Sequence, residues 1–137
     1  MADDLAGLKA FHGHLGPYAV AGFRLGRYAL RRLQAEAYFG LETDVWCPEA
    51  PPPSCFLDGI QVSTGCTLGK RNVRHHLAEE VRAAFKNRHT GEVLVLRLRP
   101  EAIQRAVEQM QAHNDVAGAR LIQSMTDEEL LEEIAEA

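Results

Sequence analysis

The segment that most constrains the fold lies past the middle of the chain and has the pattern of a β-hairpin. Two runs, 81–87 and 93–98, flank a short turn that contains Gly91, and leucine occupies every second position of the later run. Strict alternation of this kind is typical of strands with one buried face. A helix over 76–86 is the alternative, and we favour strand from about residue 81. Because such a short turn joins antiparallel strands, the chain is expected to build an antiparallel sheet.

Helical and strand patterns alternate along the rest of the chain. Gly22 and Gly26 leave a thin face on the first long helical segment, so another element is expected to pack closely against it. The expected elements, in order, are a helical turn at 4–11, a helix from Pro17 to about Gly40, a strand at 42–47, a short helix at 55–61, a strand at 72–76, the hairpin, a helix from Pro100, and a terminal helix whose start, Thr126 to Glu129, has capping-box spacing. This order predicts one α+β domain spanning residues 1–137.

Charge and hydropathy exclude two classes of partner. The formal net charge is −4 and no basic block stands out, so the sequence lacks the footprint of a nucleic-acid-binding protein. No apolar run approaches the ~20 residues that a membrane-spanning helix needs. The first residues lack the basic and apolar regions of a secretory signal, so we expect a cytoplasmic protein.

The three cysteines are expected to be free thiols. Cytosolic proteins rarely form disulfides, and an odd number of cysteines argues against a disulfide framework. A cysteine with a role is then a metal ligand or a reactive thiol. Cys47, which follows Trp46 at the end of a predicted strand, is interpreted as a core residue.

His12 and His14, separated by Gly13, are the first candidate ligands. Histidine is the commonest metal ligand, because its neutral ring offers a lone pair at physiological pH. Two histidines at this spacing point the same way on an extended backbone, whereas a helix would splay them. Gly13 permits a tight, non-helical path. Taken alone, the pattern is also typical of incidental histidines.

Cys55 and Cys66 are the second candidate pair. Thiolate sulfur suits zinc, which takes nitrogen and sulfur ligands. The spacing of this pair matches no zinc knuckle, so it predicts no site by itself. Cys55 can equally pack beside Phe56 as a small apolar side chain. Cys66 lies in a predicted turn, where we expect its thiol to be accessible.

Three further polar residues lie in the same part of the sequence. Asp58 follows Cys55 by three residues, on the same side of a helix, and is a candidate for orienting a metal-bound histidine or acting as a general base. Lys70 and Arg71 close the glycine-rich turn 65–71. That turn is not a phosphate-binding loop, since Arg71 stands where Ser or Thr would hold magnesium. Its amides and the two cations could still hold a small anion.

Two motifs in these segments resemble the signatures of the E-subunit family of formylmethanofuran dehydrogenase. The first is FHGHLGP at 11–17, followed by GFRLG at 22–26. The second, more specific motif is CFLDGIQVSTGCTLGK at 55–70. Together they place the resemblance over roughly residues 8–75.

The resemblance implies a mixed, mostly antiparallel sheet flanked by helices, similar to the catalytic-domain fold of glyceraldehyde phosphate dehydrogenase. It also implies a homodimer and a metal, usually zinc, at His14, Cys55 and Cys66, with His12 and Asp58 close by. Many members continue into a cysteine-rich zinc ribbon; the absence of cysteine after Cys66 is expected of the core domain alone. A partner subunit that is an oxidoreductase is a further expectation from the family.

Three functions follow from these observations. The first is a metal-binding accessory or small-molecule-handling protein, with zinc held by His12, His14, Cys55 and Cys66, and a small anionic ligand at Lys70 and Arg71. The second is a metal-free thiol enzyme, in which Cys66 or Cys55 is activated by a histidine base, with Asp58 and Cys66 as the catalytic candidates. The third is a structural interaction module.

Overall fold

The structure, a computed structural model, describes the backbone of residues 2–136 and the side chains of residues 5–136. Its helices are α1 (Ala2–His12), α2 (Pro17–Leu33), the 3-10 turn η1 (Tyr38–Gly40), α3 (Cys55–Thr64), α4 (Pro100–Ala112), α5 (Asp115–Ser124) and α6 (Asp127–Leu130). Its strands are β1 (Leu41–Cys47), β2 (Val73–Leu77), β3 (Arg82–Asn87), β4 (Val93–Leu98) and β5 (Leu131–Ile134). None of the helices among these residues is long and apolar enough to cross a bilayer.

The strands form one mixed sheet in the order β2-β1-β3-β4-β5. Strands β1 and β2 are parallel, and every other neighbouring pair is antiparallel. The prediction of an α+β fold with a mostly antiparallel sheet is therefore confirmed. The hairpin is also confirmed, since β3 and β4 pair directly from Arg82–Arg97 to Lys86–Val93.

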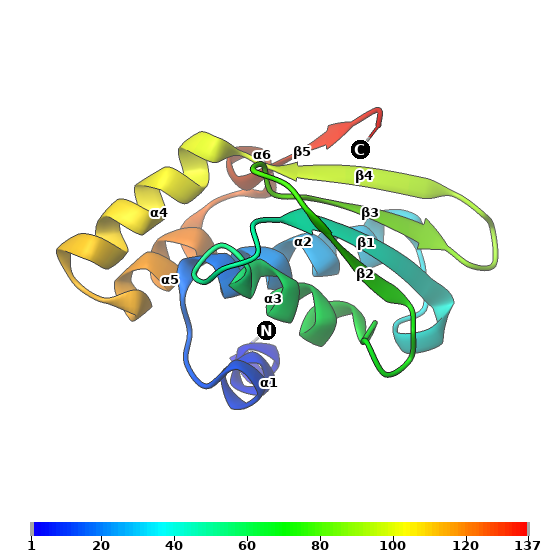
Figure 1. The fold of residues 1–137 in the computed structure, drawn as a ribbon, viewed down its shortest axis with the longest axis horizontal. Helices are drawn as coiled ribbons and strands as arrows, with labels where there is room; N and C mark the ends of the chain where they lie inside the picture. Colours follow the sequence, from blue (N-terminus) through cyan, green and yellow to red (C-terminus); the bar gives the residue numbers. More distant parts are fainter. Residues whose placement is uncertain (1, 137) are drawn as a thin grey trace.

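Helices α2 and α3 lie on the same side of the sheet, side by side (Figure 1). The buried face of β1, Leu41, Val45 and Cys47, alternates with partly exposed residues, as expected for a strand with one face in the core. The core also contains Phe56 and Ile60 of α3, both fully buried. The sheet and these two helices thus bury a common apolar layer.

Glycines let α2 and α3 approach until their backbones nearly touch. A β-carbon at Gly22 would collide with the carbonyl oxygen of Phe56, and one at Gly59 would collide with that of Ala19. The close packing predicted for the thin face of α2 is therefore confirmed. It fixes the start of α3, and with it Cys55, beside the start of α2.

Three element predictions were wrong. Helix α2 ends at Leu33 rather than near Gly40. Gln34 takes a left-handed backbone conformation, and its backbone N–H caps the helix. Thr126 and Glu129 form the predicted capping box, but α6 has only four residues. The chain continues as β5, which pairs with β4 from Leu98–Leu131 to Val95–Ile134. This pairing supplies hydrogen-bond partners for backbone N–H and C=O groups of β4.

Helix α5 was not predicted.

Candidate functional site

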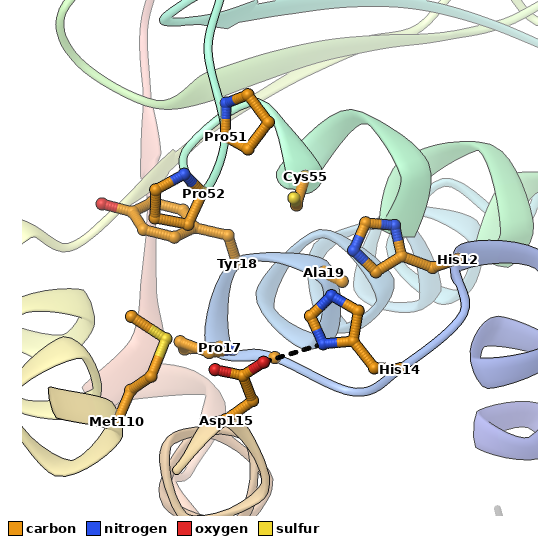
Figure 2. A pocket seen from close by; sticks show the side chains of 11 residues that line it. His12, His14, Pro17, Tyr18, Ala19, Pro51, Pro52, Cys55, Met110 and Asp115 are labelled. Atoms are coloured by element: carbon orange, nitrogen blue, oxygen red, sulfur yellow. Dashed lines mark ion pairs between the residues drawn. The ribbon is translucent and has the colours of Figure 1, made fainter. Parts of the chain in front are cut away.

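A pocket of about 300 Å³ opens where the linker between α1 and α2, the loop before α3, and helices α4 and α5 meet. Its lining residues, most of them labelled in Figure 2, are His12, His14, Gly16, Pro17, Tyr18, Ala19, Pro51, Pro52, Cys55, Met110 and Asp115. Three of the four predicted metal ligands, His12, His14 and Cys55, therefore line one cavity.

His12 is held by a carboxylate behind it. It ends α1, and its Nδ1 lies 2.6 Å from Oδ2 of Asp58 on α3. Because the carboxylate accepts, Nδ1 donates and Nε2 carries the lone pair of the ring. The His12 side chain is only 10% exposed, and its Nε2 is buried without a hydrogen-bond partner among the described residues. A buried polar atom of this kind needs an explanation, and a bound ion is one of the usual ones.

His14 also pairs with a carboxylate through its Nδ1, but its side chain is more exposed than that of His12. Its Nδ1 lies 3.0 Å from Oδ2 of Asp115, the first residue of α5 (Figure 2). The rings of His12 and His14 have their centres 4.8 Å apart. The extended backbone expected between them is not found: His12 ends a helix, and Gly13, with φ of 100°, turns the chain so that both rings reach the pocket.

Cys55 directs its sulfur toward the space beside both rings, as Figure 2 shows. It is the first residue of α3 and is partly buried. Burial raises the pKa of its thiol, and the negative charges of Asp58 and Asp115 raise it further. The free protein therefore holds Cys55 mainly as a thiol at neutral pH, which weakens it as an unassisted nucleophile.

Cys66 lies away from this pocket, and the expectation of an accessible thiol there was wrong. It is fully buried, and its Sγ donates to the carbonyl oxygen of Leu41 at 3.3 Å. Cys55 begins α3 whereas Cys66 follows its end, and a helix of that length spans about 15 Å. Thr43 and Leu41 of β1 supply the partners of the buried thiol.

Lys70 and Arg71 also lie outside the lining of the pocket. The Nζ of Lys70 is 5.7 Å from the ring centre of Tyr38 and 5.9 Å from that of Phe39. The structure thus does not bring the two predicted anion-binding residues to the histidine pair. Cys47 is fully buried in the core, as interpreted, and burial together with nearby Cys55 raises the pKa of its thiol to about 11.

No three His, Cys, Asp or Glu side chains in the described part of the chain are arranged as a ready metal site. The donors that share the pocket are Nε2 of His12, the free ring nitrogen of His14 and the thiol of Cys55. The His14 side chain is 54% exposed, so its ring can turn without disturbing the core. These donor types nevertheless fit zinc, and the unpartnered Nε2 of His12 is the atom that points to an ion.

Several lining residues were missed from the sequence. Asp115 starts a helix that was not predicted, and its neighbour Asn114 caps that helix by accepting from the N–H of Ala117. The capping residue was a usable signal for the helix, but no sequence signal links Asp115 to His14. Met110 of α4 also lines the pocket, and no motif in the sequence indicated it.

Comparisons with known proteins agree with the motifs. The family described as FmdE, molybdenum formylmethanofuran dehydrogenase operon, matches residues 11–137. A protein of Archaeoglobus fulgidus described as "Probable S-adenosyl-L-methionine-binding protein" is 36% identical over 67 residues, which are 47% of this chain and 18% of the relative. That local match covers a small part of the relative's length. Because the family match spans nearly all of the sequence, the chain belongs to the FmdE family.

Proposed function

We propose that this protein binds a transition-metal ion, with zinc the best fit, through His12, His14 and Cys55, and presents it to a small molecule in the adjoining pocket. The observation that carries the proposal is the state of His12. Its Nδ1 is fixed by Asp58 at 2.6 Å, and its buried Nε2 has no partner among the described residues.

The carboxylates of Asp58 and Asp115 support this function by orienting the two rings. A metal-binding histidine usually donates its other N–H to a carboxylate or carbonyl, which fixes the tautomer and increases the basicity of the ligating nitrogen. The same carboxylate–imidazole pair occurs twice in one pocket here, at His12 and at His14. A histidine pair that only packs would need neither the second carboxylate nor a buried free nitrogen.

The number of protein donors favours a metal ion with one open coordination position. Two imidazoles and one thiolate make three protein ligands, the number typical of catalytic rather than structural zinc sites. A bound zinc ion would supply Lewis acidity toward an oxygen or sulfur atom of a small molecule. Pro17, Pro51 and Pro52 line the same pocket and give it apolar walls.

A metal-free thiol enzyme is less well supported. Its two candidate nucleophiles are Cys55, whose pKa is raised, and Cys66, which is buried against Leu41. We therefore assign Asp58 the positioning of His12 and give Cys66 a packing role.

We infer that the partner is an oxidoreductase subunit, as the operon in the family description suggests. The large apolar side chains of Tyr38, Phe39 and Leu68 are each about 60% exposed or more and offer a surface for such a subunit or for a second copy of this chain. This surface lies at the far end of α3 from the pocket, so either partner could bind without closing the site.

Elemental analysis of the untagged protein tests the metal site. We expect close to one equivalent of zinc in the wild-type protein and none after His12→Ala. The control is His89→Ala, which removes an exposed histidine in the β3–β4 turn and should leave the zinc content unchanged. Retention of zinc by His12→Ala, or a wild-type protein that cannot be loaded, would overturn the proposal.

A further inference from the structure

The pocket is polar at one end and apolar over the rest of its wall. Figure 2 shows His12 and His14 on one side of the pocket with Cys55 near them, and Asp115 reaching His14 from the side of Met110. The remaining wall consists of apolar groups, namely Pro17, Ala19, Pro51, Pro52, Met110 and the ring of Tyr18. A molecule in this pocket would therefore meet the donor atoms of His12, His14 and Cys55 at its head and a mostly apolar wall along its body.

The charge of the wall excludes an anionic body. No lysine or arginine is among the lining residues of the described chain, and the charged carboxylate that lines the pocket is Asp115. A second carboxylate, Asp58, lies behind His12. A carboxylate or phosphate on the body of the ligand, away from the proposed ion, would lose its hydration near these like charges, and no lysine or arginine of the lining would offset the loss. Lys70 and Arg71, the residues expected to hold a small anion, are not among the lining residues.

The volume sets the size of the ligand. About 300 Å³ is at the small end of the range for small-molecule sites. A single aromatic ring together with its head group fits in such a space, and the rings of Pro51, Pro52 and Tyr18 offer apolar faces against which it can pack.

From these three observations, we propose that the pocket selects a small uncharged molecule with an apolar, ring-sized body and one oxygen, nitrogen or sulfur donor at its head. This inference rests on the proposed function, because the donor atom is expected to reach the ion held by His12, His14 and Cys55. The apolar wall then determines specificity, and the three ligating side chains determine affinity for the head group.

Two probes that differ in one charge test the inference on zinc-loaded protein. Phenylmethanethiol offers a sulfur donor and a neutral ring, and 4-(mercaptomethyl)benzoate adds a carboxylate at the other end. By calorimetric titration, we expect the dissociation constant of the neutral probe to be at least about tenfold lower than that of the carboxylate probe, because the carboxylate is desolvated without a partner.

The variant Met110→Lys places a cation in the wall and should reverse or abolish the preference for the neutral probe. Gln109→Lys adds the same charge at an exposed position of the same helix and should not.

The zinc content of each sample, measured before and after titration, separates the two proposals. Equal or tighter binding of the carboxylate probe to the wild-type protein would overturn the inference, as would absence of binding by either probe to protein that retains its zinc. In both cases the metal site would stand. A sample that never takes up zinc would overturn the proposed function and the inference with it.

Discussion

His12 differs from the other histidines of the chain in having one ring nitrogen fixed and the other buried and unpaired among the described residues. By contrast, His76 on β2 bonds Asp44 and stacks on Trp46 at a partly exposed position, an arrangement that needs no ion. The difference lies in burial. At His12 the free nitrogen lacks water as well as a protein partner, which is costly unless a ligand binds there.

The variant Asp58→Asn tests whether the carboxylate supports the metal through His12. An amide retains the size of the side chain but loses the charge that raises the basicity of Nε2. We expect zinc affinity to fall about 10- to 100-fold, the usual effect of losing such a partner, with the fold unchanged. Competition with a chromogenic chelator measures the affinity, and Asp44→Asn, which removes the carboxylate beside His76, is the matched control. Equal affinity in Asp58→Asn and wild type would contradict this role.

At the level of single residues, the sequence indicated part of the site. His12, His14 and Cys55 line one pocket, and Asp58 contacts His12. Cys66 was misjudged because a glycine-rich turn usually lies at the surface, whereas the start of this turn, Gly65 and Cys66, is buried against β1. Asp115 could not be predicted, since its approach to His14 depends on how a distant helix packs.

Helices α2 and α3 hold the pocket together through their glycine contact. Cys55 and Asp58 both lie in the first turn of α3, so any shift of that helix moves a proposed ligand and the carboxylate that contacts His12 together. The closeness of the two helices therefore matters for the site as well as for the core.

Gly22→Ala tests this contact. The added methyl group would collide with the backbone oxygen of Phe56, which cannot rotate away. We expect the free energy of unfolding to fall by about 1–3 kcal/mol, as for an overpacked core, and zinc affinity to fall with it. Gly7→Ala is the matched control: a β-carbon there meets no atom within 4 Å, so α1 should gain up to about 1 kcal/mol in helix propensity. Urea denaturation measures both variants, and a stable Gly22→Ala protein would contradict the account of the interface.

Strong local sequence patterns predicted most helices and strands correctly, whereas an element that depends on contacts with distant residues was missed. The strands near 42–47, 72–76, 81–87 and 93–98 follow from alternation and turn residues, and the structure confirms them. Strand β5 escaped prediction because its acidic, capped segment has the local pattern of a helix. Its strand conformation depends on pairing with β4, which is a tertiary interaction.

Across the whole molecule, the C-terminal segment is tied back to α2 and the sheet by ion pairs and hydrogen bonds. Arg24 reaches Asp127 at 2.9 Å, and the hydroxyl of Tyr28 donates to Glu133 at 2.6 Å. Arg97 on β4 pairs with Glu132 beside it on β5. These contacts secure the edge of the sheet opposite β2, and none of their side chains lines the pocket.

The fold as a whole therefore separates the proposed metal site from the exposed aromatic surface around Tyr38 and Phe39. The pocket lies at the start of α3 and the aromatic surface at its end. This arrangement suits a domain that handles a small molecule at one end while another subunit binds at the other.

X-ray absorption at the zinc edge tests the central claim most directly, because it counts the ligands of the ion by element. We predict one sulfur from Cys55 and two imidazole nitrogens from His12 and His14, with the remaining position filled by a light atom from solvent. A first shell with two or more sulfurs, or one without imidazole, would contradict the site described above.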